Sequence, residues 1–337
     1  MKTLLNLCII SNDKFYKNKY TNHNDLGSII EVFETKYNIK IIGRNTKSKF
    51  KFLTIKKKAK FLNFFSFKIF NNIKSLNKNT KFLFISLTPF NLCVFLLVKL
   101  YFKKNFFLYL RSNGFNEYKI IFGTFGKLFY YLMLLVIIKN VKLIITSVDL
   151  NFKKNFFYLV KPSELTSIWF KKRKKNSTTP LKLLYLGRFR KEKGIKDFIK
   201  LISSSDLNFE LKVYGLDYNY KAKSNSKIKY FPQIAGSEKI IKAYDYCNIF
   251  ILPSYTESAP KVIWESLARL RPIIVFEEIA HVAINKIGVY VCKRNLVDLI
   301  KTIENIMSNY TSIQMSIKKN KFSTKKKFNQ DLINILN

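Results

Sequence analysis

Residues 253–268 read PSYTESAPKVIWESLA, which indicates a loop followed by the start of a helix. The apolar run NIFIL just before it predicts a buried strand, and Pro260 suits the first turn of a helix because proline lacks an N–H and fixes φ. The free amides at a helix start bind phosphate oxygens, helped by the helix dipole. Glu257 and Glu265 lie on either side of Pro260. We expect both acids to contact the uncharged parts of a ligand whose anionic part lies at this helix start.

Around this stretch, short apolar runs alternate with longer periodic ones, which is typical of βαβ units and a parallel sheet. The strands predicted in the second half are LKLLYLG, FELKVYG, KIKYFP, NIFILPS, RPIIVF and GVYVC. The helices predicted there are GIKDFIKLISSS, SEKIIKAYDYC, the segment 260–270 and NLVDLIKTIENIM. In the first half we predict the strands LLNLCII, IKIIGR, KFLFISL, FFLYLR and VKLIITS, and the helices GSIIEVFETKYN and 124–138.

The length of 337 residues suits two α/β domains rather than one. We place a first domain at 1–165, a linker rich in Lys, Ser, Thr and Pro at 166–180, and a second domain at 181–310. The basic segment 311–337 is a candidate terminal helix. Two doubly wound domains are expected to leave a ligand-binding cleft between the carboxyl ends of their strands.

The formal net charge is +40, with 61 Lys and Arg against 21 Asp and Glu. Such an excess indicates either attraction to an anionic membrane surface or a background bias toward Lys, Asn, Ile and Phe, and both readings stay open. A nucleic-acid partner is not expected, because the basic residues are spread along the chain without a zinc finger, basic zipper or aromatic RNP pattern.

Two apolar runs bear on a membrane. Phe82–Val98 is marginal in length for a span and is interrupted by Pro89, and the run 128–138 is shorter still. We therefore expect no span, and read 128–138 as a core helix, with attachment to the membrane interface as the alternative. The run LLNLCII is read as a core strand rather than a signal peptide.

The four cysteines stand far apart in apolar runs and form no CxxC pair. We predict buried thiols rather than disulfides or metal ligands. They are Cys8, Cys93, Cys247 and Cys292.

The stretch LYLGRFRKEKG, residues 184–194, is a second candidate for anion binding. A strand runs into Gly187 and then presents Arg188 and Lys193 before Gly194 and a helix. Cations next to glycines, whose backbone can approach a ligand closely, suit a diphosphate. Each charge-assisted hydrogen bond contributes about 1.5–3 kcal/mol. The alternative is a solvated Lys-rich loop.

Together the motifs are more specific than either alone. GRFRKEKG, then PSYTE, P-x4-E, and A-x3-P before a buried strand, resembles glycosyltransferase family 4, the retaining nucleotide-sugar transferases of GT-B fold. The resemblance covers about residues 181–310 and implies two Rossmann-like, doubly wound parallel-sheet domains facing a central cleft. The first would take the acceptor and the second the nucleotide sugar.

The resemblance also implies roles for individual residues. Arg188 and Lys193 would neutralise the donor diphosphate and stabilise the leaving nucleotide. Glu257 would lie by the transferred sugar and Glu265 would hold the ribose. No cofactor and no divalent metal are expected, since the two cations take the metal's place. The rest of the expected donor site comprises Gly187, Ser258, Ala259 and Pro260.

The sequence departs from the family in several places. Glycine is frequent in the family where Ser258 and Leu270 stand, so we expect a stiffer loop here. FEEIAH, residues 276–281, replaces a glycine-rich turn, and we expect Glu277 or Glu278 to line the donor pocket.

The usual glycine-rich acceptor loop is missing, so the acceptor side rests on weaker candidates. The strand end YLRSNGFNEYK, residues 109–119, offers Arg111 and Glu117 for the acceptor and Asn113 as a catalytic candidate. His23, in the first loop, is a further acceptor-side candidate.

The resemblance implies a hexosyltransferase that serves a saccharide or lipid-linked saccharide in envelope polysaccharide or lipopolysaccharide synthesis. It would act in the cytoplasm or at the inner face of the membrane. An inactive GT-B relative that binds nucleotide or protein partners is the main alternative, and a nucleic-acid binder is a weaker one.

Overall fold

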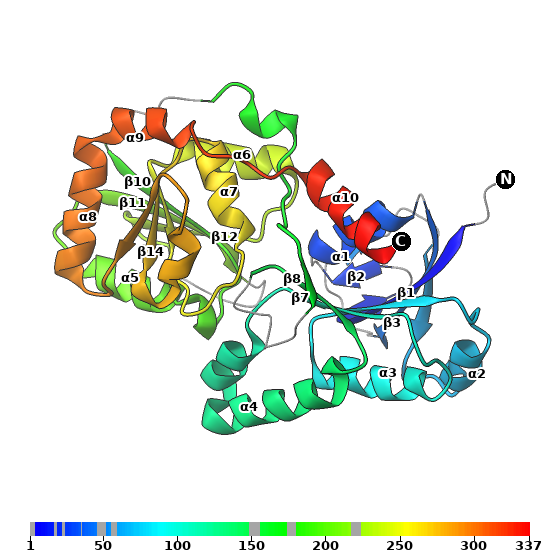
Figure 1. Cartoon of the computed structure of the whole chain (residues 1–337). Helices are drawn as coiled ribbons and strands as arrows, with labels where there is room; N and C mark the ends of the chain where they lie inside the picture. Colours follow the sequence, from blue (N-terminus) through cyan, green and yellow to red (C-terminus); the bar gives the residue numbers. More distant parts are fainter. Residues whose placement is uncertain are drawn as a thin grey trace. The chain divides into compact units, whose positions relative to one another are not determined.

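The computed structural model describes residues 4–16, 19–21, 24–34, 36–45, 52–54, 59–147, 156–173, 180–216 and 224–337. The chain divides into two compact units (Figure 1). The first comprises residues 1–161 together with 327–337, and the second comprises 162–326. The GT-B fold expected from the sequence, with one parallel α/β sheet in each unit, is confirmed.

The first unit is built on a mainly parallel sheet. Its central path runs in the order β3-β1-β6-β7-β8-β9, and β5 lies beside β3. The short strand β2 pairs antiparallel with β1, and β4 pairs antiparallel with β2. The strands are β1 (Leu5–Tyr16), β2 (Lys19–Thr21), β3 (Tyr37–Asn45), β4 (Phe52–Thr54), β5 (Lys60–Asn63), β6 (Lys81–Ile85), β7 (Phe106–Leu110), β8 (Lys142–Ile145) and β9 (Phe157–Leu159). Both faces of β7 are buried, which explains its unbroken apolar sequence.

Helices cover both faces of this sheet. α2 (Ile69–Lys74), α3 (Pro89–Lys99) and α4 (Gly114–Ile138) pack on one face, and α1 (Asn24–Phe33) and α10 (Lys325–Leu336) on the other. α10 returns from the far end of the sequence, and the Tyr37 hydroxyl donates a hydrogen bond to the carbonyl of Leu336 at 3.1 Å. The basic segment 311–337 is thus mostly helical and is shared between the two units.

Two features of the first unit differ from the sequence-based reading. Pro89 does not merely interrupt an apolar run: it is the first residue of α3, and Thr88 caps the helix by accepting a hydrogen bond from the Asn91 amide. Cys93, expected to be buried, lies exposed on α3, whereas the other three cysteines are buried as predicted.

The second unit has a fully parallel sheet in the order β12-β11-β10-β13-β14-β15. Its strands are β10 (Leu181–Leu186), β11 (Phe209–Leu216), β12 (Ile228–Pro232), β13 (Ile249–Leu252), β14 (Ile273–Phe276) and β15 (Val289–Cys292). Its α-helices are α5 (Ile195–Ser203), α6 (Ser237–Tyr246), α7 (Lys261–Ala268), α8 (Leu296–Ser308) and α9 (Tyr310–Ile317). The strands and helices predicted for this half are confirmed, with ends shifted by a few residues.

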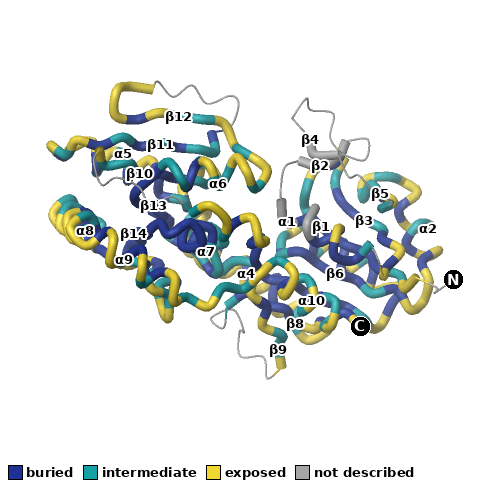
Figure 2. Tube along the Cα trace, turned by 90° about the horizontal axis from the view of Figure 1, so that it is seen from above, coloured by how far each residue is buried: buried dark blue, intermediate teal, exposed yellow. Residues whose placement is uncertain are grey.

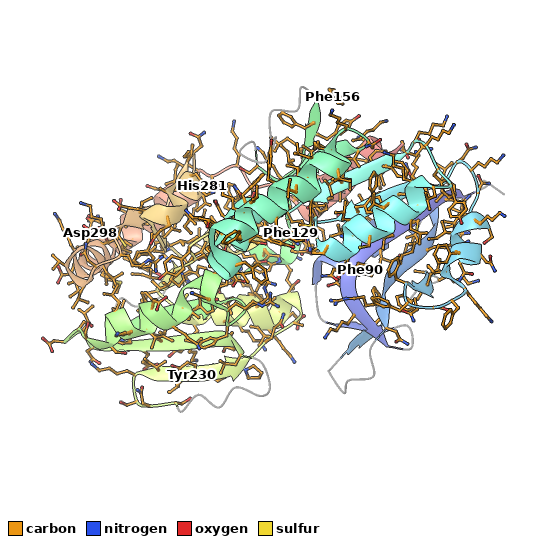
Figure 3. All side chains as sticks on the ribbon, turned by 90° about the horizontal axis from the view of Figure 1, so that it is seen from below. Phe90, Phe129, Phe156, Tyr230, His281 and Asp298 are labelled. Carbon is orange, nitrogen blue, oxygen red and sulfur yellow. The ribbon has the colours of Figure 1, made fainter. Side chains whose placement is uncertain are left out.

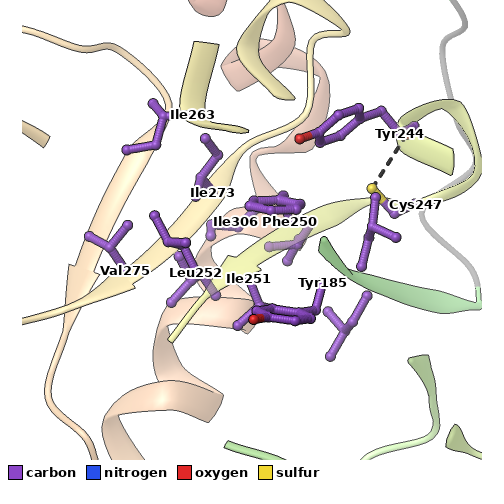
Figure 4. Close-up of a cluster of buried hydrophobic side chains, with 14 of the residues drawn as sticks. Tyr185, Tyr244, Cys247, Phe250, Ile251, Leu252, Ile263, Ile273, Val275 and Ile306 are labelled. Atoms are coloured by element: carbon purple, nitrogen blue, oxygen red, sulfur yellow. Dashed lines mark hydrogen bonds between the residues drawn. The ribbon is translucent and has the colours of Figure 1, made fainter. Parts of the chain in front are cut away.

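The core of the second unit forms around β13, whose four residues are all buried (Figure 4). Phe250 packs there against Tyr244 of α6, with ring centroids 5.4 Å apart. Figure 2 shows how burial differs between the helices of this unit: α7 is mainly buried, whereas the outer side of α8 is exposed. These buried strands fix the positions of the loops at their carboxyl ends.

Residues 166–173, which we predicted to be part of a linker, lie in the second unit. They include the 3-10 helix Ser167–Phe170, whose Trp169 is 1% exposed. Residues 174–179 of the predicted linker lie outside the described residues.

Candidate functional site

The candidate site lies in the second unit, where the chain leaves two neighbouring strands in opposite directions. β10 and β13 are paired, with Leu183 opposite Ile249; the chain after β10 goes to β11 on one side, and the chain after β13 goes to β14 on the other. Ligands of open parallel sheets bind at the carboxyl ends of the strands at such a switch point. The two stretches singled out in the sequence are the two loops that meet there.

The first loop follows β10 and is tightly constrained. The Tyr185 hydroxyl donates a hydrogen bond to the carbonyl of Arg188 at 2.9 Å. Gly215, at φ 120°, lies against the backbone of this loop: a Cβ at position 215 would be 1.7 Å from the carbonyl oxygen of Gly187. The loop therefore has a fixed backbone, while the Arg188 side chain is exposed.

The two loops are joined to each other directly. The Tyr255 amide donates to the Glu192 carbonyl at 2.9 Å, and the Tyr255 hydroxyl donates to the Asp197 carboxylate at 2.8 Å. Gly194 adopts φ 61°, and a Cβ at this position would lie 2.1 Å from the Pro253 carbonyl oxygen. Glycine at 194 thus allows the close approach of the two loops.

Two residues that the sequence placed in separate roles form an ion pair. Lys193 Nζ lies 2.6 Å from Glu257 Oε1, and the side chains are 18% and 12% exposed. The same carboxylate oxygen accepts a hydrogen bond from the Ser254 hydroxyl at 2.7 Å. A cation and a carboxylate are therefore held together at the edge of the sheet, with the exposed Arg188 on the same loop as Lys193.

The helix start predicted at Pro260 is present, with its boundary one residue later. Pro260 is the N-cap residue, with ψ 117°, and α7 begins at Lys261 rather than at the proline. Pro260 itself makes no side-chain hydrogen bond to this helix end. Ser258, 7% exposed, and Ala259 directly precede it. The first turn of α7 therefore lies directly after the loop where we expect a phosphate.

Glu265 lies on α7 and is 9% exposed. Its Oε2 accepts a hydrogen bond from the Tyr244 hydroxyl at 3.1 Å. Burial, and secondarily the charge of Glu265, raises the pKa of Tyr244 well above its ordinary value, so the phenol keeps its proton. Tyr244, which the sequence analysis did not single out, therefore orients the carboxylate expected to hold the ribose.

A further cation, Arg294, supports the loop that follows β13. Its Nη2 donates to the Pro253 carbonyl at 3.0 Å, and its guanidinium lies 4.3 Å from the Tyr255 ring centroid and 4.2 Å from that of Phe276. Its Nε also donates to Glu278 at 2.6 Å. Burial acts to raise the pKa of Glu278, but the hydrogen bond from Arg294, a backbone hydrogen bond and the charge of Arg294 together hold the pKa below its ordinary value.

Arg294 was missed by the sequence analysis, although a signal existed: it comes two residues after the predicted strand GVYVC, much as Arg188 follows LKLLYLG. The expectation that Glu277 or Glu278 lines the donor pocket stays a prediction; both are exposed. His281 from the same segment places Nε2 2.9 Å from the carbonyl oxygen of Glu257.

The acceptor-side candidates belong to the first unit. Arg111, at the end of β7, donates from Nε to the Ser86 hydroxyl at 3.3 Å, and Ser86 has the unusual φ of 65°. Asn113 is the N-cap of α4 and accepts from the Asn116 amide, which gives it a structural role; Glu117 lies in the first turn of the same helix. His23 lies outside the described residues. Among the described residues, no group of three His, Cys, Asp or Glu side chains could hold a metal ion.

Solved structures with the same fold cover nearly the whole chain. Sucrose-phosphate synthase from Thermosynechococcus elongatus is 14% identical, with a TM-score of 0.70 over 99% of this chain and 95% of its own. Anabaena HepE, solved with UDP-glucose, is 10% identical, with a TM-score of 0.68 over 98% and 99%. WaaG, a glycosyltransferase involved in lipopolysaccharide biosynthesis, is 11% identical, with a TM-score of 0.64 over 98% and 99%. These likenesses define a GT-B protein.

The family follows from the second unit. Residues 167–324 match the family described as glycosyl transferases group 1, so this unit is a domain of that family, and the resemblance expected from the sequence is confirmed. No curated protein sequence matches the chain.

Proposed function

We propose that the protein is a retaining hexosyltransferase that moves a sugar from a nucleotide-diphosphate donor to a saccharide or lipid-linked saccharide. The observation that carries the proposal is the meeting of the two loops at the switch point, where Lys193 and Glu257 lie 2.6 Å apart and the exposed Arg188 belongs to the same loop as Lys193. One end of such a site suits a diphosphate and the other an uncharged sugar.

In this proposal each group has one task. Arg188, Lys193 and the first amides of α7 neutralise the diphosphate and stabilise the negative charge that develops on the leaving nucleotide. Glu265, oriented by Tyr244, accepts hydrogen bonds from the ribose hydroxyls. Glu257 lies beside the transferred sugar. The reaction needs no metal here, since the two cations carry the positive charge.

The ion pair between Lys193 and Glu257 affects how the donor can bind. Because Glu257 already bonds Lys193, an entering diphosphate must share the ammonium group with the carboxylate or draw it away. The Ser254 hydroxyl keeps a hydrogen bond on Glu257 in either case. Donor binding and the position of Glu257 are therefore coupled.

The donor and the acceptor are proposed from the structural neighbours. HepE was solved with UDP-glucose, so UDP-sugars are the first donors to try. WaaG and WaaB take part in lipopolysaccharide synthesis, which supports an envelope saccharide as acceptor. We propose in addition that the protein acts in the cytoplasm or at the inner face of the membrane. Arg111, Glu117 and His23 remain the proposed acceptor-side residues, and Asn113 remains a catalytic candidate.

A donor panel tests the proposal. UDP-, GDP- and ADP-sugars are added to the wild-type chain, and the melting temperature and the release of nucleoside diphosphate are measured. Because a chain of net charge +40 binds many anions, sulfate and inorganic pyrophosphate at matched ionic strength are the controls. We expect sugars of one nucleotide to stabilise the protein beyond both controls and to be turned over.

Two results would contradict the proposal. If no nucleotide sugar stabilises the protein more than pyrophosphate does, the site is not a donor site. If one nucleotide binds but neither its hydrolysis nor sugar transfer occurs with any saccharide acceptor offered, the protein is a binding relative rather than an enzyme.

A further inference from the structure

The outer side of α4 is apolar, although one side of the helix is already packed in the core. Tyr130, Met133, Leu134 and Ile137 are buried against the sheet of the first unit. On the opposite side, large apolar residues recur at helical spacing and are between 46% and 83% exposed. They are Phe122, Phe125, Leu128, Phe129, Leu132 and Leu135.

The neighbouring helix α3 extends this surface. α3 and α4 pack on the same face of the sheet and contact each other, as the view from below shows (Figure 3). The outward stripe of α3 carries the exposed Cys93, Leu96 and Leu100, spaced three and four residues apart. We call the outward sides of α3 and α4 together the α3–α4 face.

α4 is long and apolar enough to cross a membrane by length and composition alone, but its structure favours a different arrangement. Gly123, at φ 70° and ψ −156°, divides it into two helices. The longer part, residues 124–138, covers about 22 Å at 1.5 Å per residue, less than the roughly 30 Å of a hydrocarbon core. Since its inner side is also part of the protein core, the helix is placed to lie on a bilayer rather than across one.

The charges around the face decide which partner it fits. Between Ser86 and Ser147 the sequence has eight Lys and Arg residues but a single acid, Glu117. Lys99, Lys119, Lys127 and Lys139 lie exposed on or beside the two helices. A second copy of this chain would bring like charges together, whereas anionic lipid headgroups would neutralise them.

We propose that the α3–α4 face docks the protein on the interface of an anionic lipid bilayer. The exposed aromatic and aliphatic side chains enter the boundary between headgroups and acyl chains, and the surrounding lysines bind the headgroups. This inference stands on the first unit alone and does not depend on the donor site of the second.

Vesicle sedimentation tests the proposal. The full-length protein is mixed with vesicles of phosphatidylcholine, or of phosphatidylcholine with three-tenths phosphatidylglycerol. We expect at least about tenfold stronger partitioning to the anionic vesicles, weakened by salt. Phe125→Ser with Phe129→Ser should reduce partitioning by at least about tenfold, because two large apolar side chains no longer enter the interface. Ile284→Ser with Val297→Ser, which alters two exposed apolar residues of the second unit, is the matched control.

Cys93 supplies a second readout within the face. The other three cysteines are buried, and burial raises the pKa of Cys8, Cys247 and Cys292 to about 12, so an environment-sensitive fluorophore should attach at Cys93 alone. Its emission should shift to the blue with anionic vesicles and stay unchanged with neutral ones.

The proposal is overturned if the wild-type protein ignores anionic vesicles, or if the double Phe variant binds them as well as the wild type does. It is also overturned if the wild type is a dimer that the Phe variant dissociates while vesicles leave the Cys93 emission unchanged, since the face would then serve a second copy. Circular dichroism and nucleotide binding, measured on the double Phe variant, serve as the test that this variant is folded. Retained nucleotide binding with no vesicle binding would overturn this inference and leave the proposed function intact.

Discussion

At the scale of single residues, the pair formed by Lys193 and Glu257 is central to the proposed chemistry. The two positions are 64 residues apart in the sequence and meet only because β10 and β13 are neighbours. Each residue limits what the other can do, because the ion pair holds the ammonium group and the carboxylate together at the site.

Substitution of Lys193 tests this interdependence. We expect Lys193→Ala to lower kcat by about 10²–10³-fold, because one of the charges that stabilise the leaving diphosphate is lost. Lys191→Ala, an exposed lysine in the same 3-10 turn, should leave kcat unchanged. Steady-state kinetics with the preferred donor measures both, and equal losses in the two variants would refute the role of Lys193.

Gly194 sets how closely the two loops approach. Gly194→Ala should lower the free energy of unfolding more than Gly236→Ala does, because only at 194 would the new Cβ meet a backbone oxygen. Both positions have positive φ, and at Gly236, with φ 92° and ψ 133°, a new Cβ would meet no atom within 4 Å, so this control carries a backbone cost without a clash. Urea denaturation of the two variants makes the comparison, and equal losses would mean that the loops separate freely.

At the scale of elements, the second unit holds the chain before β10 through a buried arginine. Arg269, at the end of α7 and 1% exposed, donates to both carboxylate oxygens of Asp245 at 2.8 Å. It also donates to the carbonyls of Trp169 and Lys171, each at 2.8 Å. A segment whose composition indicated a linker is thus fixed to the ends of α6 and α7.

Loss of this arginine should destabilise the second unit strongly. Arg269→Ala removes two hydrogen bonds to Asp245 and those to the carbonyls of Trp169 and Lys171. We therefore expect a loss of about 3–5 kcal/mol in the free energy of unfolding. Arg190→Ala, which removes an exposed arginine of the same unit, should change it by less than about 0.5 kcal/mol. Denaturant unfolding measures both, and a small effect at Arg269 would show that the segment is held by Trp169 alone.

The sequence predicted elements better than contacts between them. Apolar runs located β13 and β14, because a parallel strand buried on both faces needs an unbroken apolar sequence. Local sequence patterns do not predict which strands become neighbours. The contacts that depend on this order were therefore missed: Lys193 with Glu257, Tyr244 with Glu265, and Arg294 with the Pro253 carbonyl. The burial of Trp169 was missed for the same reason, since its surroundings in the sequence are polar.

At the scale of the whole molecule, the order of the chain and the division into units do not coincide. Residues 327–337 belong to the first unit although they follow the second in sequence. Leu332 of α10 is fully buried in the first core, together with Phe328 and Leu336. The stability of the first unit therefore depends on the last helix of the chain.

Leu332→Ala should separate the stabilities of the two units. We expect the first unit to lose about 2–5 kcal/mol through the cavity left in its core, while nucleotide binding by the second unit is retained. Asn334→Ala, at an exposed position of the same helix, is the control. Unfolding followed by circular dichroism, with nucleotide binding measured in parallel, tests this, and simultaneous loss of nucleotide binding under native conditions would contradict it.

The central claim is that the loop after β10 binds a diphosphate. Calorimetric titration of nucleoside diphosphates tests it most directly. UDP, GDP and ADP are titrated into the wild type, Arg188→Ala and Arg190→Ala at one ionic strength. We predict that one diphosphate binds the wild type and Arg190→Ala alike, and binds Arg188→Ala about 10–100-fold more weakly, as the loss of a charge-assisted hydrogen bond requires. Equal affinity for Arg188→Ala and the wild type, or no binding of any of the three, would contradict the claim.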